Sequence, residues 1–227
     1  MTTADKTELA SLLNEIRTVL DQKKSALLAN GGQEDYQRAQ HDVVVAQQLN
    51  HMLAISPSPS PGIPADGDAM VSARNEAMAD NVRWLLEQEG AKGRILVFAH
   101  NMHVMNSMLQ GGPWAKFRHP SSSTGQFLRS ALGSDVVIIG GTAASTSGSL
   151  PPMEKNPASF DDALSQLAAP RFLIDLRASA GNTAVSKWLS EPMPMHANIF
   201  DHMIVSPRLA FDAVYFIDTL TIARVPE

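Results

Sequence analysis

Two histidines separated by three positions carry the strongest chemical signal in this chain. His100 and His103 lie in the segment Ala99-His100-Asn101-Met102-His103, directly after an apolar run. A neutral imidazole can take a proton from water near neutral pH, and its protonated form can return one to a leaving group. A second imidazole can orient the first or stabilise an oxyanion, and the amide of Asn101 can donate a hydrogen bond. The segment is therefore a candidate for hydrolytic acid–base chemistry, although histidines at this spacing are as often structural or surface residues.

Metal binding is the main alternative for a His-x-x-His pair. A catalytic zinc site normally needs three protein ligands, so a third would have to come from a distant residue such as Asp175, Asp212 or His202. The sequence contains no His-Glu-x-x-His helix motif. We therefore predict neither a metal nor another cofactor.

Other familiar catalytic patterns are absent from the sequence. It has no Gly-x-Ser-x-Gly nucleophile elbow, no Gly-x-x-x-x-Gly-Lys phosphate loop and no Gly-x-Gly-x-x-Gly dinucleotide turn. The run Gly140-Gly141-Thr142 is better interpreted as a turn than as an anion site. The chain also has no cysteine, which excludes disulfides, zinc–thiolate sites and cysteine nucleophiles.

The elements that must position the histidines are predicted from four short apolar runs. Such runs are typical of strands buried on both faces, and they are Ile95–Ala99, Val136–Ile139, Phe172–Ile174 and Val214–Ile217. Helical segments are expected between several of them, at Gly125–Leu132, Phe160–Ala168 and Ala184–Leu189. This alternation predicts an α/β fold with a largely parallel buried sheet flanked by helices. Ligands gather outside the carboxyl ends of such strands, where His100, Asn101 and His103 would lie.

The amino-terminal part of the chain predicts a helical hairpin over residues 1–56. Leucine, isoleucine and valine recur every three or four positions from Leu9 to Leu20, Asn30-Gly31-Gly32 interrupts the pattern, and a second helix is expected at Glu34–Ile55. A coiled-coil or oligomerisation arm is the alternative. Residues 57–68 form a Pro/Ser-rich linker, and residues 69–227 form the α/β portion, beginning with a helix at Ala69–Gln88.

Composition and charge limit the possible partners. Of the 227 residues, 44% are hydrophobic and 18% charged, which indicates a soluble globular protein. The net charge of -5 argues against a nucleic-acid or anionic-membrane partner. The apolar runs are too short to span a bilayer, and no targeting segment is visible. We therefore predict a cytoplasmic protein with a small-molecule partner. The sequence makes no prediction of oligomeric state.

Two paired motifs resemble the erythromycin esterase family. The helix Arg74-Asn75-Glu76-Ala77-Met78-Ala79-Asp80-Asn81 is similar to the family's Arg-acid-x-x-Met-Ala-x-Asn helix, and it is followed by the Ala-His-Asn-x-His segment. Thr124-Gly125-Gln126-Phe127-Leu128 is similar to the family's Met-Gly-x-x-Leu segment. Phe211-Asp212-Ala213 resembles the start of the family's closing strand. The resemblance runs in order from about Arg74 to Arg224.

This resemblance implies a hydrolase that opens macrolide lactones or related esters with histidine-activated water, without a covalent serine intermediate. His100 and His103 would be catalytic, while Arg74 and Asn101 would bind substrate. For Arg74, a structural ion pair on the helix is the alternative. Such a hydrolase would inactivate a macrolide antibiotic and so confer resistance.

The sequence also departs from the family pattern. Asn75 stands where the family usually has an acid, and Gln126 replaces a frequent histidine. The family's upstream Gly-Glu-x-x-His-Gly segment has no counterpart between Met1 and Ile55. We therefore expect either an incomplete half of a catalytic domain, inactive alone, or a non-catalytic remnant that binds a small molecule or a protein.

Overall fold

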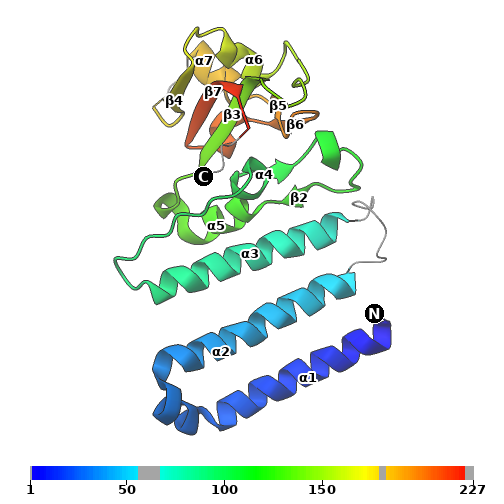
Figure 1. The fold of residues 1–227 in the computed structure, drawn as a ribbon, viewed down its shortest axis with the longest axis vertical. Helices are drawn as coiled ribbons and strands as arrows, with labels where there is room; N and C mark the ends of the chain where they lie inside the picture. The colour runs from blue at the N-terminus through cyan, green and yellow to red at the C-terminus, as the bar shows by residue number, and fades with distance from the viewer. Residues whose placement is uncertain (1, 56–66, 179–182, 223–227) are drawn as a thin grey trace.

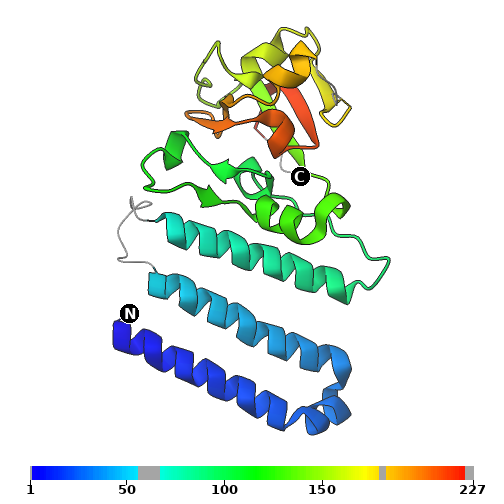
Figure 2. The ribbon, with the colours of Figure 1, turned by 180° about the vertical axis from the view of Figure 1, so that it is seen from behind.

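The chain forms a stack in which a helical hairpin, a third long helix and an α/β portion follow one another (Figures 1 and 2). The computed structural model describes residues 2–55, 67–178 and 183–222. The expected linker lies almost entirely outside these residues. The division into a hairpin, a linker and an α/β portion at the stated boundaries stays a prediction.

The hairpin consists of α1 (Thr3–Gln22) and α2 (Lys24–Ile55). Thr2 and Asp5 form a capping box at the start of α1, satisfying backbone N–H groups that a helix start leaves unpaired. Gly32 interrupts α2 with φ 83°, a left-handed conformation that glycine accepts readily. The predicted break is thus confirmed, although the first helix already ends at Gln22. The next helix, α3 (Asp68–Gln88), packs along α2, and the rings of His41 and Trp84 stack at 3.8 Å.

The principal sheet is mixed and has three strands in the order β3-β7-β4. The strands β3 (Ile139–Thr146) and β7 (Ala213–Leu220) are parallel, whereas β4 (Arg171–Asp175) runs antiparallel to β7. Short helices lie beside the sheet: α6 (Phe160–Ser165), α7 (Ala184–Trp188) and α8 (Pro207–Ala210). The α/β class is therefore confirmed. The strand expected at Val136–Ile139 instead starts at Ile139 and continues through Gly140 and Gly141, which we had interpreted as a turn.

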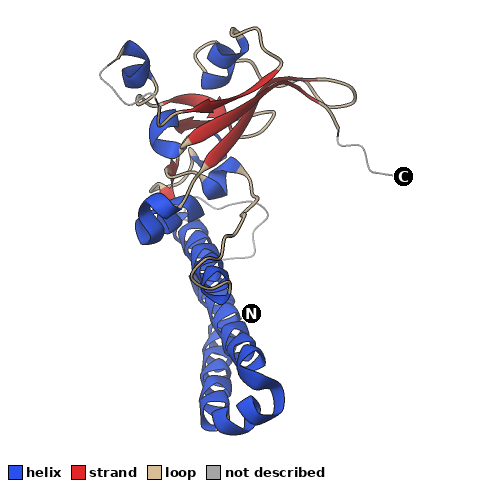
Figure 3. Ribbon diagram, turned by 90° about the vertical axis from the view of Figure 1, so that its left-hand side faces the viewer, coloured by secondary structure: helices blue, strands red, loops and turns tan. Residues whose placement is uncertain are grey.

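Two small antiparallel hairpins and a pair of helices complete the described structure. β1 (Met108–Leu109) pairs with β2 (Ser121–Ser122), and β5 (Met193–His196) pairs with β6 (His202–Val205). Between α3 and the sheet lie α4 (Asn101–Val104) and α5 (Thr124–Leu132), with single 3-10 turns at Gly112–Trp114 and Gly133–Asp135. Figure 3 shows the long helices extending away from the sheet.

The core lies between the sheet, the β5–β6 hairpin and the short helices. Its completely buried side chains include Met105, Phe160, Met195, Met203 and Phe216. Asp212 ties this region together because its carboxylate pairs with Arg129 on α5 and accepts a 2.7 Å hydrogen bond from the backbone N–H of Ile138. No helix among the described residues is both long and apolar enough to cross a bilayer.

The prediction that Ile95–Ala99 is a strand buried on both faces is wrong in this structure. The segment is not paired in any sheet of the described residues, and burial alternates along it. Leu96 is 91% exposed and Phe98 is 97% exposed. A strand buried on both faces needs hydrogen-bonded neighbouring strands and side chains packed against each face. The described residues provide no neighbouring strand for Ile95–Ala99, and they leave Leu96 and Phe98 exposed.

Candidate functional site

His100 and His103 lie at the two ends of one helical turn. His100 is the residue before α4, and its Nδ1 accepts a 3.2 Å hydrogen bond from the backbone N–H of Met102. This contact caps the helix, in the way that a serine or aspartate side chain usually does. In a neutral imidazole, an Nδ1 that accepts leaves the proton on Nε2. His100 therefore carries an Nε2–H donor.

His103 is held from behind by a completely buried amide. Its Nδ1 lies 2.9 Å from Oδ1 of Asn75, a residue of α3 with no exposed surface. The Nδ2 of Asn75 donates to the carbonyl of Ser122 at 2.8 Å, and the hydroxyl of Thr124 donates to Oδ1 at 3.3 Å. These partners identify Oδ1 as the acceptor, so Nδ1 of His103 must carry the proton. The lone pair of the neutral ring is then on Nε2.

The surroundings of His103 favour its neutral form. Burial lowers the pKa of His103, and the charges of Arg74 and His100 lower it further. Arg74 is exposed and makes no ion pair with any described residue. Its guanidinium is thus close enough to lower the pKa of His103, while its N–H donors are not used in an ion pair. The alternative of a structural ion pair gains no support from these contacts.

Asn101 fastens α4 to the sheet. Its Nδ2 donates to the carbonyl oxygen of Gly141 at 2.6 Å, and its Oδ1 accepts from the N–H of Gly141 at 2.9 Å. Both polar atoms of the amide are therefore engaged with the backbone of β3. This bidentate contact fixes the position of the turn that carries the two histidines.

The distant residues considered as third metal ligands lie in other interactions. Asp175 pairs with Arg177, which lowers the pKa of Asp175 to about 2, and Asp212 pairs with Arg129. His202 lies beside His196 and Asp161. In the described part of the chain, His100 and His103 belong to no group of three possible ligands. The arrangement instead offers one imidazole acceptor, one imidazole donor and a nearby guanidinium.

The family assignment rests on a match along nearly the whole chain. The model of the erythromycin esterase family matches residues 1–220. The chain belongs to the erythromycin esterase family. The match includes the amino-terminal hairpin, which the sequence motifs had not covered. No curated protein matches this family member significantly.

Solved structures confirm the fold of this family member. A Bacillus cereus protein is 22% identical with a TM-score of 0.80, and a succinoglycan biosynthesis protein is 19% identical with a TM-score of 0.74. A mutant of the erythromycin esterase EreC in its open conformation is 15% identical with a TM-score of 0.63. The three alignments cover 100%, 97% and 96% of this chain. They cover only 55%, 52% and 54% of the other chains, so this member spans about half their length.

Sequence reasoning did not identify how this family member orients His103. Asn75 was noted only as a departure from the family's acid, and Thr124 only as part of a motif. Both contact the same amide oxygen in the structure. The signal was the buried face of α3, on which Val71, Asn75 and Ala79 recur at spacings of four. An asparagine on such an apolar face needs a polar partner.

Two surface depressions of this family member lie away from His100 and His103. One is lined by α1 residues including Asn14 and Thr18, and another lies between α2 and α3 near His51 and Asp80. Neither includes His100, His103 or Arg74. The turn that carries His100 and His103, together with Arg74, lies outside both depressions, and we call it the His100–His103 wall.

Proposed function

We propose that this chain contributes the His100–His103 wall of an erythromycin-esterase-like hydrolase that cleaves an ester or a macrolide lactone. The observation that carries the proposal is the complementary pair of imidazoles. Asn75 leaves the Nε2 lone pair of His103 available as a base, and capping of α4 leaves an Nε2–H donor on His100. A general base and a hydrogen-bond donor within one helical turn are the groups that water attack on a carbonyl requires.

The reaction follows from these two states. Nε2 of His103 takes a proton from water, and the resulting hydroxide attacks the carbonyl carbon of the ester. The Nε2–H of His100 donates to the developing oxyanion. Collapse of the tetrahedral intermediate breaks the bond to the alcohol oxygen, which receives the proton from the imidazolium of His103. The products are an alcohol and a carboxylic acid, which loses its proton to solvent, or one hydroxy acid from a lactone.

Arg74 and Asn101 have different roles in this proposal. The guanidinium of Arg74 binds a substrate oxygen, because its planar donors match a carbonyl or carboxylate. Asn101 acts as a positioning residue, since its amide is already paired with Gly141. Its contribution to substrate binding is thus indirect, through the placement of α4.

We further propose that the catalytic domain is completed by a segment outside this chain. Two observations support this division. Leu96 and Phe98 are exposed, and the chain aligns with only about half the length of each of the three solved structures. We call the completed protein the full-length parent. If no completing segment exists, the exposed Leu96 and Phe98 favour the second candidate, a binding module without activity.

Histidine substitutions in the full-length parent test the assignment. We expect His100→Ala and His103→Ala each to lower kcat/KM for an aryl ester or a macrolide at least about a hundredfold, the usual contribution of acid–base groups. The exposed His119→Ala serves as the matched control and should keep full activity. Near-normal turnover in both site variants would contradict the proposal.

The isolated chain gives a second test. With only one wall of the site, we expect the 227-residue chain to hydrolyse the same substrates at no more than the background rate. Sequencing upstream of the coding region for Met1 then separates the two candidates. A reading frame encoding Gly-Glu-x-x-His-Gly supports the hydrolase, whereas a promoter and stop codon support the binding module.

A further inference from the structure

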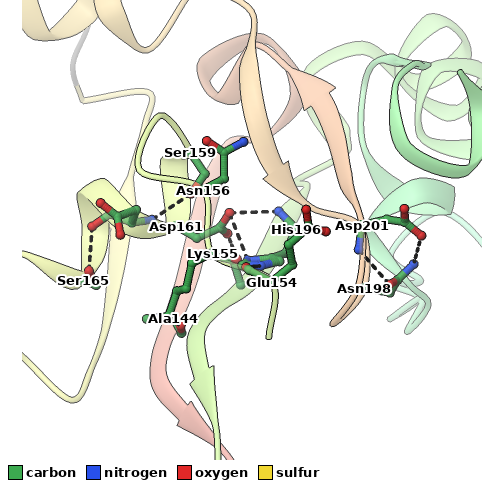
Figure 4. A network of polar contacts seen from close by, with 12 residues as sticks. Ala144, Glu154, Lys155, Asn156, Ser159, Asp161, Ser165, His196, Asn198 and Asp201 are labelled. Atoms are coloured by element: carbon green, nitrogen blue, oxygen red, sulfur yellow. Dashed lines mark hydrogen bonds and ion pairs between the residues drawn. The ribbon is translucent and has the colours of Figure 1, made fainter. Parts of the chain in front are cut away.

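A second group of titratable side chains lies apart from His100 and His103. Asp161 at the start of α6, His196 at the end of β5 and His202 at the start of β6 each offer one ligand atom, and these atoms lie within 4.8 Å of one another. Asp161 is 1% exposed and His196 is 8% exposed. Figure 4 shows Asp161 and His196 facing each other.

Asp161 is positioned by two residues, Thr142 and His196. Its Oδ1 accepts from the hydroxyl of Thr142 on β3, and its Oδ2 accepts from the backbone N–H of His196 at 2.9 Å. Nδ1 of His196 also lies 3.2 Å from Oδ2. The carboxylate is therefore fixed in place with an imidazole nitrogen directly in front of it.

The imidazole of His196 faces this carboxylate with an unsatisfied nitrogen. Its Nε2 lies 2.8 Å from the carbonyl oxygen of Glu154, so Nε2 carries the donated proton. In the neutral ring, Nδ1 is then a lone pair. Among the described residues this buried Nδ1 has no hydrogen-bond partner of acceptable geometry. Two electron-rich atoms thus face each other in a buried site, which is costly unless a positive charge lies between them.

His202 brings a second imidazole to the same place. It is the cross-strand partner of His196 in the β5–β6 hairpin, and the two ring centroids are 4.2 Å apart. Its Nε2 is buried and has no hydrogen-bond partner within the described ranges. One nitrogen of each imidazole and one oxygen of the buried carboxylate therefore lie within 4.8 Å of one another, contributed by three elements.

We propose that Asp161, His196 and His202 bind a divalent transition-metal ion of the zinc class. Imidazole ligands suit Zn²⁺ and its neighbours, whereas Mg²⁺ and Ca²⁺ prefer oxygen ligands only. Two nitrogens and one carboxylate oxygen fill three positions of a tetrahedral site. Ligand atoms at about 2.0 Å from such an ion lie roughly 3.3 Å apart, and rotation of the two imidazole rings closes the remaining separation. The carbonyl of Glu154 acts as the outer partner that fixes the His196 tautomer.

The ion would link separate elements of the fold, with its fourth position open to water. It joins α6 to both strands of the β5–β6 hairpin, and Thr142 links the site to β3. The adjacent residue of β3, Gly141, holds Asn101 and thereby α4. Metal binding would thus stabilise the part of the fold against which the His100–His103 turn is fastened. The proposal does not depend on the hydrolase activity.

Zn²⁺ binding by the 227-residue chain tests this proposal. After treatment with a chelator and its removal, we expect the chain to take up one Zn²⁺ in competition with a chromophoric chelator, and the thermal midpoint to rise with Zn²⁺ concentration. Co²⁺ in place of Zn²⁺ should give the intense visible absorption of a tetrahedral site, whatever the outcome for the variants. Absence of stoichiometric binding to the folded chain overturns the proposal and leaves a proton between Asp161 and His196.

Matched variants locate the ion. His202→Gln removes a ligand whose Nε2 supports no other contact, so we expect it to fold and to weaken Zn²⁺ binding at least about tenfold. Asp161→Asn should weaken binding further but also disturbs the contacts to Thr142 and His196. If Asp161→Asn does not fold, the His202→Gln result decides whether the assignment holds. The exposed His119→Gln should bind as the wild type does; equal binding by His202→Gln contradicts the assignment.

Discussion

At the scale of single residues, His103 is oriented by a neutral amide rather than by a carboxylate. A carboxylate behind a histidine fixes the tautomer and also stabilises the imidazolium, which raises its pKa. Asn75 provides only the first effect, and burial together with Arg74 lowers the pKa of His103. The ring is therefore a weaker base that remains unprotonated to a lower pH. This explains how an amide at the position of the family's acid is compatible with a base at His103.

The pH dependence of the full-length parent follows from this arrangement. Because protonation of His103 removes the base, we expect kcat/KM to fall as the pH drops, with a midpoint below the ordinary histidine value of about 6.5. Arg74→Ala removes a positive charge that lowers the pKa of His103, so the acidic limb should move to higher pH. The same variant should raise KM about tenfold through loss of a charged hydrogen bond. Measuring the pH profile of kcat/KM for both proteins checks this.

A control from the same helix separates the local effect from general charge loss. Arg83 is also on α3, but it pairs with Asp80, and the charges that lower the pKa of His103 are those of Arg74 and His100. Arg83→Ala should therefore leave the acidic limb where it is. A shift of that limb to lower pH in Arg74→Ala, or equal shifts in both variants, would contradict the assigned role of Arg74.

At the scale of elements, the contact between α4 and α5 depends on Gly125. A Cβ at this position would lie 1.8 Å from the carbonyl oxygen of Val104 and 2.4 Å from that of Met105. Both obstacles are backbone atoms, so relief requires movement of a whole helix. We expect Gly125→Ala to lower the free energy of unfolding by at least about 3 kcal/mol, at the upper end for overpacking. The urea midpoint of the 227-residue chain measures this.

Gly141 provides the comparison for this substitution. It also lies close to α4, yet a Cβ there would meet nothing within 4 Å. Its contact with Asn101 uses backbone atoms only, so Gly141→Ala should change stability by no more than about 0.5 kcal/mol. If the two alanine variants unfold at the same urea concentration, close packing is not the reason for glycine at position 125.

Local sequence signals predicted the helices and strands that depend mainly on nearby residues. The apolar runs at Phe172 and Val214 became β4 and β7, and the predicted helix near Gly125 became α5. The run at Ile95–Ala99 had the same local signal but is paired with no strand among the described residues, and periodicity contains no information on neighbours. The cluster of Asp161, His196 and His202 was not predicted either. It depends on the pairing of β5 with β6 and on packing of α6, which bring together residues without a common spacing.

The candidate site shows the same limit. The position after an apolar run, together with the paired family motifs, identified His100 and His103 as candidates, although that run is not a strand among the described residues. Their different tautomers were not predictable, because these depend on Asn75 from another helix and on the cap of α4. The engagement of Asn101 with Gly141 likewise joins residues that are 40 positions apart.

At the scale of the whole molecule, one apolar edge is exposed next to the candidate site. Leu96 and Phe98 on the extended segment form this edge, and Ile139, the first residue of the edge strand β3, is also 53% exposed. Unpaired extended backbone with apolar side chains is a template for strand addition from another chain. The same edge would be internal in the full-length parent. One substitution there should therefore have opposite consequences in the two proteins.

Phe98→Lys tests this difference directly. In the isolated 227-residue chain, Phe98 is 97% exposed, so lysine should reduce self-association without lowering the urea midpoint. In the full-length parent, the completing segment would bury position 98, and an unpaired lysine should cost several kcal/mol of stability. Sedimentation velocity measures association, and urea unfolding measures stability. Leu49→Lys on α2, where leucine is 54% exposed, is the control and should be tolerated in both proteins. If Phe98→Lys leaves the parent as stable as Leu49→Lys does, the edge is not covered and the division of the domain is wrong.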